Sequence, residues 1–159
     1  MSDRVAFLDE SKGGSFVLVA VVCERWKIPG YRRTLQEARL KGQRRIHMRN
    51  ESPRRKKMLV DLVETMDIIC IEEVSHLTHQ PKARAQALEV LAMRLVAEGV
   101  TEIVIEVDES FVQADNQILA RVIRSGNPNR VTRYRHESPT VEPMLWAADI
   151  RAWAYAKNH

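Results

Sequence analysis

The chain has 159 residues, of which 45% are hydrophobic and 29% charged, with few glycines and prolines. Such a composition describes a globular protein and excludes a disordered or fibrous one, and the length suits a single domain spanning residues 1–159. No apolar run approaches the roughly 18 residues of a membrane helix, and no basic-then-apolar signal segment precedes the first strand pattern. Cys23 and Cys70 both lie within apolar runs, as buried thiols in a reducing compartment do, so we expect a cytoplasmic protein that does not contact a membrane.

The net charge is only +4, but the basic residues are clustered. Residues 31–57 contain eleven lysines or arginines against two acids, and residues 121–135 contain five arginines and no acid. A charge run is often only a solvated face. Two arginine-rich clusters that are poor in acid instead favour a nucleic-acid-binding surface, because guanidinium groups match phosphate geometry. The candidate nucleic-acid-binding residues are Arg44, Arg45, Arg49, Arg54, Arg55 and Lys56.

The first half of the chain predicts three strands and one helix. Residues 4–10 and 15–24 read as a β-hairpin, with K-G-G as its turn. The second of these strands is apolar on both faces, which predicts a central, covered position in the sheet. After the basic segment, residues 54–66 have apolar side chains at helical spacing, and residues 67–74 read as a strand.

The second half alternates between helices and strands. A helix runs from Pro81 to Gly99, a strand covers residues 101–108, and a helix covers residues 116–124. A short polar strand at residues 130–136 is expected at an edge of the sheet, and a final helix begins near Glu142 and Pro143. The chain therefore predicts an α/β fold, a mixed sheet of about five strands with helices on both faces.

Carboxylates stand at positions where apolar residues are expected. Asp9 ends the first strand on the face of Val5 and Phe7, and Glu106 and Asp108 share one face at the end of the strand at residues 101–108. Asp149 lies between two tryptophans on the stripe of the last helix that should face the sheet. Burying a carboxylate costs several kcal/mol unless it is paired with a base or bound to a metal.

Two interpretations of these acids are open. Arginine partners could neutralise each one separately. Alternatively Asp9, Glu106, Asp108 and Asp149 converge to hold Mg²⁺ or Mn²⁺, because carboxylates without His or Cys partners suit hard cations. Glu142 precedes Asp149 by seven residues and could share its face, but Pro143 equally favours Glu142 as a helix cap. Trp146 and Trp153, at helical spacing, are expected in the core.

Three segments resemble a known family. The strand ending in D-E-S, the glycine turn into F-V-L-V-A-V-V, and the closing E-P-M-L-W-A-A-D-I-R-A-W resemble an uncharacterised bacterial family, a domain of unknown function in the ribonuclease H-like superfamily. The segment R-R-I-H-M-R-N-E is similar to a His-containing segment of that family. In ribonuclease H itself the first three strands run consecutively, whereas this chain has a helix predicted between the second and third.

The resemblance implies acids on the first strand, on the fourth strand and on the last helix. These correspond to Asp9, to Glu106 or Asp108, and to Asp149, while Glu51 and Glu142 are candidates for a further helical glutamate. It also favours a role for His47, as a proton donor to a leaving group or as a phosphate contact. His136, near Glu142 in the sequence, is a further candidate for the same pocket.

The leading hypothesis is a divalent-metal-dependent nuclease that cleaves phosphodiester bonds by a carboxylate-bound two-metal mechanism. The alternative is a non-catalytic module on the same fold that binds nucleic acid or a protein, with its acids paired to arginines. A third possibility, an enzyme of small phosphates, predicts a deep closed pocket. The oligomeric state is not predicted.

Overall fold

The computed structural model describes residues 3–11, 14–126 and 128–158. Its strands are β1 (Arg4–Ser11), β2 (Phe16–Glu24), β3 (Ile69–Ser75), β4 (Glu102–Glu106) and β5 (Arg133–Glu137). Its α-helices are α1 (Ile28–Glu37), α2 (Pro53–Glu64), α3 (Gln80–Ala97), α4 (Val112–Arg124) and α5 (Met144–Asn158). Two short 3₁₀ helices are η1 (Arg25–Lys27) and η2 (Met48–Asn50).

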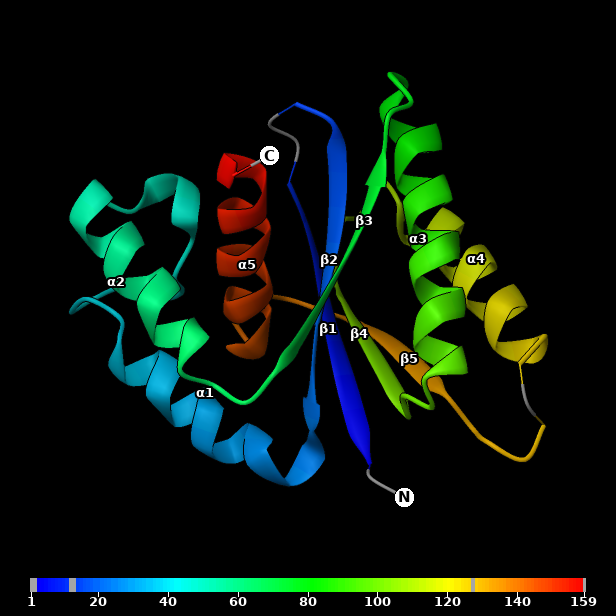
Figure 1. Cartoon of the computed structure of the whole chain (residues 1–159), viewed down its shortest axis with the longest axis horizontal. Helices are drawn as coiled ribbons and strands as arrows, with labels where there is room; N and C mark the ends of the chain where they lie inside the picture. Colours follow the sequence, from blue (N-terminus) through cyan, green and yellow to red (C-terminus); the bar gives the residue numbers. More distant parts are fainter. Residues whose placement is uncertain (1–2, 12–13, 127, 159) are drawn as a thin grey trace.

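The strands form one sheet in the order β3-β2-β1-β4-β5, with β1 in the middle (Figure 1). β1 is antiparallel to β2 and parallel to β4; β2 and β3 are antiparallel, and β4 and β5 are parallel. The predicted mixed sheet is confirmed, as are the pairing of the first two strands, the interior position of β2 and the edge position of β5. The first two residues of the predicted K-G-G turn lie outside the described residues. Because β1 and β4 are parallel neighbours, their carboxyl ends lie at the same edge of the sheet.

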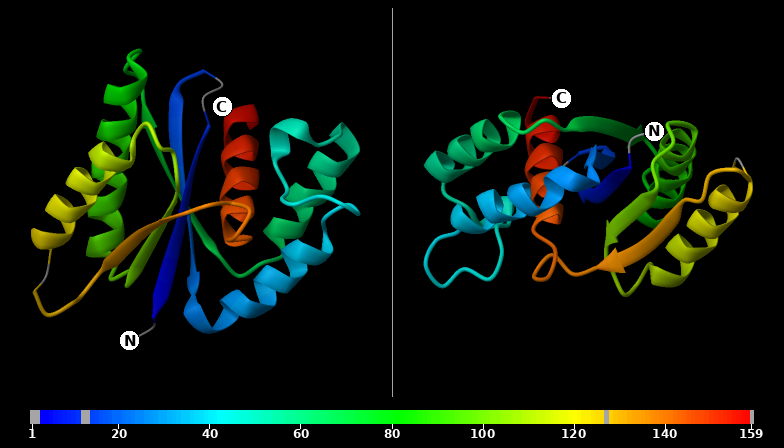
Figure 2. Two further views of the ribbon diagram at one scale, coloured as in Figure 1. Left: turned by 180° about the vertical axis from the view of Figure 1, so that it is seen from behind. Right: turned by 90° about the horizontal axis from the view of Figure 1, so that it is seen from below.

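Helices cover both faces of this sheet (Figure 2). On one face α1, α2 and α5 bury a core that includes Phe7, Val21, Val104 and Trp146. On the other face α3 and α4 bury Leu8, Leu18 and Ile105 with their own apolar stripes. Successive residues of β1 therefore point into different cores, as the alternation of strand side chains requires.

Local signals explain where several helices begin and end. Ser52 caps α2, its hydroxyl accepting a hydrogen bond from the Arg55 N–H at 3.3 Å, and Pro53 occupies the first helical position. The stripe that includes Leu88, Leu91 and Leu95 faces the sheet from α3. Gly99, with a φ of +80°, ends that helix in the left-handed conformation that glycine adopts most easily.

The structure corrects the sequence prediction at two places. Helix α1 was not predicted: η1, α1, η2 and α2, not a single helix, connect β2 to β3. Strand β4 ends at Glu106, so Asp108 lies in the turn after the strand and not within it. In the part of the chain that the structure describes, no helix is both long and apolar enough to cross a membrane.

Candidate active site

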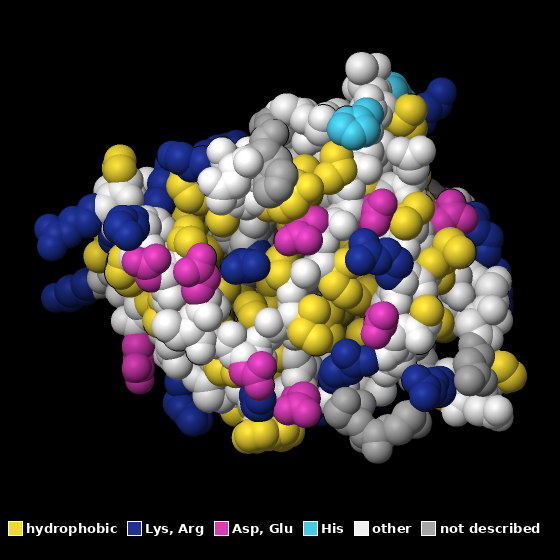
Figure 3. Space-filling model, viewed as in Figure 1, with side chains coloured by type: hydrophobic (Ala, Val, Ile, Leu, Met, Phe, Trp, Pro, Cys, Tyr) yellow, Lys and Arg dark blue, Asp and Glu magenta, His cyan; other side chains and the backbone are white. Residues whose placement is uncertain are grey.

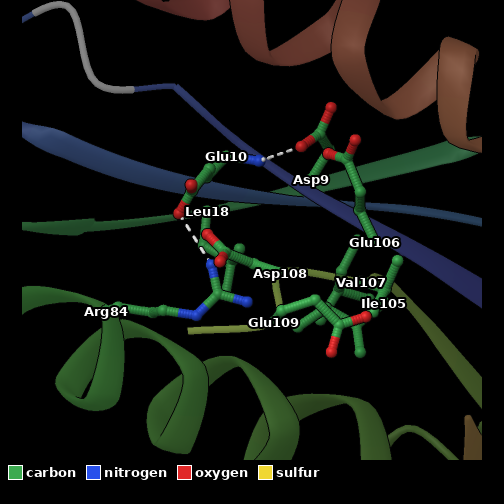
Figure 4. A pocket seen from close by; sticks show the side chains of 10 residues that line it. Asp9, Glu10, Leu18, Arg84, Ile105, Glu106, Val107, Asp108 and Glu109 are labelled. Carbon is green, nitrogen blue, oxygen red and sulfur yellow. Dashed lines mark hydrogen bonds and ion pairs between the residues drawn. The ribbon is translucent and has the colours of Figure 1, made fainter. Parts of the chain in front are cut away.

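Two carboxylates meet where β1 and β4 end. The parallel register pairs Leu8 with Ile105, so the next residues along the two strands, Asp9 and Glu106, are also neighbours. Their side chains leave the sheet on the α5 side, and Figure 4 shows the two carboxyl groups lying together beneath that helix. The Glu10 N–H donates to Asp9 Oδ1 at 2.7 Å, which fixes the orientation of the buried carboxyl group.

Helix α5 brings a third carboxylate to the same place. α5 packs across β1 and β2, and its residue Trp146, 1% exposed, anchors it in the core. One turn further along the helix, Asp149 lines the same pocket as Asp9 and Glu106. Asp149 Oδ2 accepts a hydrogen bond from the Met48 N–H at 2.8 Å, which ties the segment after His47 to the last helix.

The three carboxylates perturb one another electrostatically. Asp9 is only 6% exposed, and this burial raises the pKa of its carboxyl group well above the usual range for aspartate. A hydrogen bond to the Glu106 carboxyl and the charges of Glu106 and Asp149 raise the pKa of Asp9 further. Burial also raises the pKa of Asp149, against the opposing effects of the Met48 N–H, His47 and Arg45. Asp9 and Asp149 therefore each bind a proton more tightly than an ordinary aspartate does.

Basic side chains do not neutralise this cluster. Within the described ranges neither Asp9 nor Asp149 forms an ion pair with a lysine or arginine, and the contact of Glu106 with Arg45 Nη1 is long, at 3.4 Å. The interpretation in which each acid has its own arginine therefore does not describe Asp9 or Asp149.

An open pocket of about 530 Å³ lies over the three carboxylates. It is lined by Asp9, Glu10, Ser11, His47, Met48, Arg49, Lys56, Glu106, Asp149 and Trp153. This carboxylate pocket therefore combines acids at its floor with a histidine and two basic side chains at its walls. Such an arrangement can hold a cation and an anion at once.

The structure places the remaining predicted acids elsewhere. Asp108 turns back to accept hydrogen bonds from the N–H and the hydroxyl of Ser110, at 3.1 and 2.6 Å. Glu142 caps α5 by accepting a hydrogen bond from the Met144 N–H at 3.1 Å, and it is bound by Arg32 Nη2 at 2.6 Å. Neither Asp108 nor Glu142 lines the carboxylate pocket. Glu142 therefore acts as a cap of α5 and does not share the face of Asp149.

Two further candidates also lie apart from the pocket. Glu51 is bound by Arg55 Nε at 2.8 Å, so it is the partner of an ion pair near the start of α2. His136 Nε2 lies 3.1 Å from Asn116 Oδ1, on the side of α4.

The candidate nucleic-acid-binding residues divide into three groups. Arg45 forms an ion pair with Glu106, and Arg55 forms one with Glu51, so both are already partly neutralised within the protein. Arg49 and Lys56 line the carboxylate pocket, and Arg44 and Arg54 are exposed. Lysine and arginine side chains project from the molecule on the side of α2 (Figure 3). The basic segment thus borders the acids and leaves the pocket floor acidic.

Sequence reasoning missed an ion-pair network on the other face of the sheet. Arg84, 4% exposed, donates to Asp115 through Nε at 3.0 Å and Nη2 at 2.7 Å, and to Glu10 through Nη1 at 2.8 Å. A smaller hollow of about 330 Å³, also lined by Asp108, connects this network to Asp9 and Glu106 (Figure 4). The available signal was an arginine on the otherwise apolar stripe of α3.

The prediction for Trp153 was correct in part. Trp153 packs against the core that contains Trp146, but it is only partly buried and also lines the carboxylate pocket. Helical spacing places Trp146 and Trp153 on the same side of α5. It does not reveal that α5 extends past the edge of the core, which leaves Trp153 partly exposed.

Comparison with known proteins identifies the fold. No protein-family model matches the chain, and no curated protein matches it at a significant level. Solved structures do resemble it over 99% of its length: a mutant of the RNase HIII designated Bst (13% identity, TM-score 0.62), RNase H3 of Aquifex aeolicus (17%, 0.57) and RNase HII of Archaeoglobus fulgidus in complex with PCNA (16%, 0.53). The chain has a ribonuclease H-like fold.

This result confirms the fold that the resemblance of the three sequence segments implied. The ribonuclease H-like chain is shorter than these structures: it spans 53% of the RNase HIII chain, 57% of the RNase H3 chain and 74% of the RNase HII chain.

The chemical type of the three side chains in this pocket, all carboxylates, fits a hard divalent cation. A nearly buried aspartate beside two further carboxylates, none strongly paired with a base, is the environment in which a cation relieves repulsion most. As the side chains stand, no group of three His, Cys, Asp or Glu residues in the described ranges is arranged to hold a metal ion. Shared binding by all three acids therefore requires their side chains to move closer together.

Proposed function

We propose that this chain is a divalent-metal-dependent nuclease whose metal ligands are Asp9, Glu106 and Asp149. The observation that carries the proposal is the buried Asp9 carboxyl group, which lies beside Glu106 at the ends of two parallel strands without a lysine or arginine partner in the described ranges. The ribonuclease H-like fold and the basic residues beside the pocket support nucleic acid as the substrate.

Mg²⁺ or Mn²⁺ bound there would activate water and stabilise the departing oxygen of a phosphodiester, with two ions sharing these tasks. The chain's own residues prepare the site. Asp9 is the most buried of the three acids, and Glu106 and Asp149 add negative charge near it. Arg49 and Lys56 at the wall attract the phosphate backbone. These contacts hold the polyanion against the acids that would otherwise repel it.

His47 has a separate role in this proposal. It lines the pocket and lies close enough to Asp149 to affect the pKa of that carboxyl group. A protonated imidazole at this position can donate a proton to the leaving oxygen or bind a phosphate oxygen. Asp108 and Glu142 are left out of the proposed ligands, because Asp108 is turned toward Ser110 and Glu142 caps α5.

The direct test is cleavage of labelled RNA, DNA and RNA–DNA duplexes in the presence of Mn²⁺. We expect Asp9→Asn and Asp149→Asn to reduce cleavage to background and His47→Ala to reduce it by about 10²- to 10⁴-fold. Glu109→Gln is the matched control, because Glu109 is an exposed carboxylate three residues after Glu106 that lines the smaller hollow but not the carboxylate pocket. Cleavage that survives in Asp149→Asn would show that another site, or a contaminant, is responsible.

A non-catalytic binding module is the second candidate. The contact of Arg45 with Glu106 and the Met48 hydrogen bond to Asp149 show that the cluster is partly satisfied without an ion, which favours this alternative. It predicts nucleic acid binding that is unchanged by Mn²⁺ or by Asp149→Asn, with no cleavage of any substrate.

The proposal also includes a compartment. Cys23 and Cys70 are free thiols, as is usual in a reducing environment, and we assign the protein to the cytoplasm.

A further inference from the structure

A second hollow continues from the carboxylate pocket along the groove between α2 and α5. It has a volume of about 410 Å³ and shares Lys56 and Trp153 with the carboxylate pocket. We call it the Trp153 groove, and its main lining residues are Lys56, Lys57, Val60, Trp153 and Lys157. α2 and α5 lie side by side in both figures of the fold (Figures 1 and 2). The shared residues make the two hollows one path.

Trp153 presents an aromatic surface within this path. One side of the residue packs against the core, and its ring lies within cation–π distance of two lysines: 5.4 Å separate its centroid from Lys56 Nζ and 5.0 Å from Lys157 Nζ. Cation–π contacts at exposed sites are weak. A nucleobase stacked on the ring makes a larger contact, and it releases both ammonium groups to bind phosphates.

The charges of the groove suit the same ligand. Lys56, Lys57 and Lys157 line it together with one acid, Asp61, which is paired with Lys57 at 3.5 Å. The groove therefore combines an apolar, aromatic wall with a positive rim. A single-stranded nucleic acid offers the complementary surfaces, because its bases are free to unstack and its backbone is anionic.

We propose that the Trp153 groove is a subsite for a single nucleic acid strand that leaves the carboxylate pocket. A base stacks on Trp153 while Lys56 and Lys157 bind the flanking phosphates. The inference rests on the proposed function only in treating the carboxylate pocket as the place where the strand is cut. Trp153 and Lys157 were not among the residues that the sequence marked for binding.

The chain provides its own control for an exposed tryptophan. Trp26 is 75% exposed and lies 5.3 Å from Lys27 Nζ, so it repeats the aromatic and basic pair. It follows the end of β2 that pairs with the start of β1, at the opposite edge of the sheet from Asp9. Trp26 therefore offers the same aromatic ring and neighbouring lysine as the Trp153 groove, but it is not connected to the carboxylate pocket.

The test is the binding of labelled oligothymidylate and oligouridylate of about 12 nucleotides, measured by fluorescence anisotropy in Ca²⁺ buffer. We expect Trp153→Leu to weaken binding by about 10-fold and Trp153→Phe to restore most of it, because a phenyl ring still stacks. Trp26→Leu should stay within about twofold of the wild type. The two oligonucleotides distinguish a preference for DNA from one for RNA.

Salt dependence separates the two kinds of contact. Lys157→Ala should lower the slope of log K against log salt by about 0.7, the value for one phosphate contact to a single strand. Trp153→Leu should leave that slope unchanged. Lys82→Ala, which removes an exposed lysine on α3, is the matched control for charge. Because Trp153 also touches the core, Lys157→Glu provides a variant on an exposed side chain that should weaken binding without disturbing packing.

Three results would overturn the inference: no binding of either oligonucleotide by the wild type, equal effects of Trp153→Leu and Trp26→Leu, or equal competition by a polyglutamate peptide. Cleavage in Mn²⁺ is measured on the same variants. If binding depends on Trp153 but no cleavage occurs, the Trp153 groove is a strand-binding subsite and the nuclease proposal is wrong. If cleavage occurs and Trp153→Leu changes neither binding nor KM, the nuclease proposal is supported and the inference about the Trp153 groove is wrong.

Discussion

Asp9 is the residue on which the proposed chemistry depends. It extends the central strand on the face whose preceding residues, Val5 and Phe7, are buried in the core. Its carboxyl group contacts that of Glu106, and the charge of Asp149 also acts on it. A carboxyl group in such a place destabilises the fold when it is charged, because burial and like charges both oppose ionisation. Without a bound cation, this arrangement of carboxylates lowers the stability of the fold. Carboxyl groups with strongly raised pKa values in such positions are typical of functional sites.

The pH dependence of stability follows from the raised pKa of Asp9. A carboxyl group that binds its proton more tightly in the folded state stabilises the fold fully below about pH 4, its ordinary pKa, and loses that contribution as the pH rises through the raised value. Metal-free wild-type protein should therefore melt at a progressively lower temperature than Asp9→Asn as the pH rises. Each kcal/mol of relieved repulsion corresponds to about 2–4 °C.

Thermal melts in EDTA across the range from about pH 5 to pH 8 test this expectation. Glu109→Gln, which removes an exposed carboxylate nearby, should follow the wild-type curve. A melting temperature of Asp9→Asn below that of the wild type at every pH would mean that the Asp9 carboxylate stabilises the fold.

Sequence alone could predict that Asp9 and Asp149 lie close together, but it could not separate Glu106 from Asp108. Glu106 and Asp108 are two residues apart in the sequence. If the strand continued through both, its alternating side chains would place the two acids on the same face. The difference depends on where the strand ends, and Asp108 turns to Ser110 only because pairing stops at Glu106. Hydrogen bonds across the sheet decide that end point, and no local pattern encodes them.

At the scale of elements, a helix with a strong hydrophobic periodicity was predictable from the sequence, and a helix with a weak one was not. α3 has a continuous apolar stripe, and its limits were predicted closely. α1 escaped prediction because its buried residues, Ile28 and Leu35, are separated by polar and basic residues and no side chain caps its start. Its stripe of Ile28, Tyr31 and Leu35 has helical spacing, so the signal was present but was obscured by the positive charges.

The Arg84 network joins three elements behind the pocket. Arg84 on α3 binds Asp115 in the first turn of α4 and Glu10 on β1, and its guanidinium also lies 4.9 Å from the Phe111 ring centroid. Arg84→Met leaves Asp115, which is 1% exposed, as an unpaired buried charge. We expect this to cost about 3–5 kcal/mol of the free energy of unfolding, measured by urea denaturation.

Arg94→Met on the same helix is the matched control. Arg94 Nη1 binds Glu73 at 3.1 Å, but its side chain is 49% exposed, so its loss should cost less than about 1 kcal/mol. Equal costs for the two substitutions would contradict a structural role for the buried network.

At the scale of the whole molecule, the fold was predictable because each level of the sequence agrees with it. The hairpin, the alternation of helices and strands and the acids at the strand ends all indicate a mixed sheet with a site at one edge. What was not predictable is how distant segments meet. The Met48 N–H that binds Asp149 is a backbone group 101 residues away in the chain, and a backbone donor has no signature in the sequence.

The measurement that tests the central claim most directly is a calorimetric titration of Mn²⁺ into the wild type, Asp149→Asn and Glu109→Gln. The side-chain amide oxygen that Asp149→Asn introduces can still accept a hydrogen bond from the Met48 N–H, so the fold should be retained. We predict saturable binding to the wild type and Glu109→Gln, and binding weakened by more than about 10-fold in Asp149→Asn. Equal binding to all three proteins, or none to folded wild type even with an oligonucleotide present, would contradict the assignment of the carboxylates as a metal site.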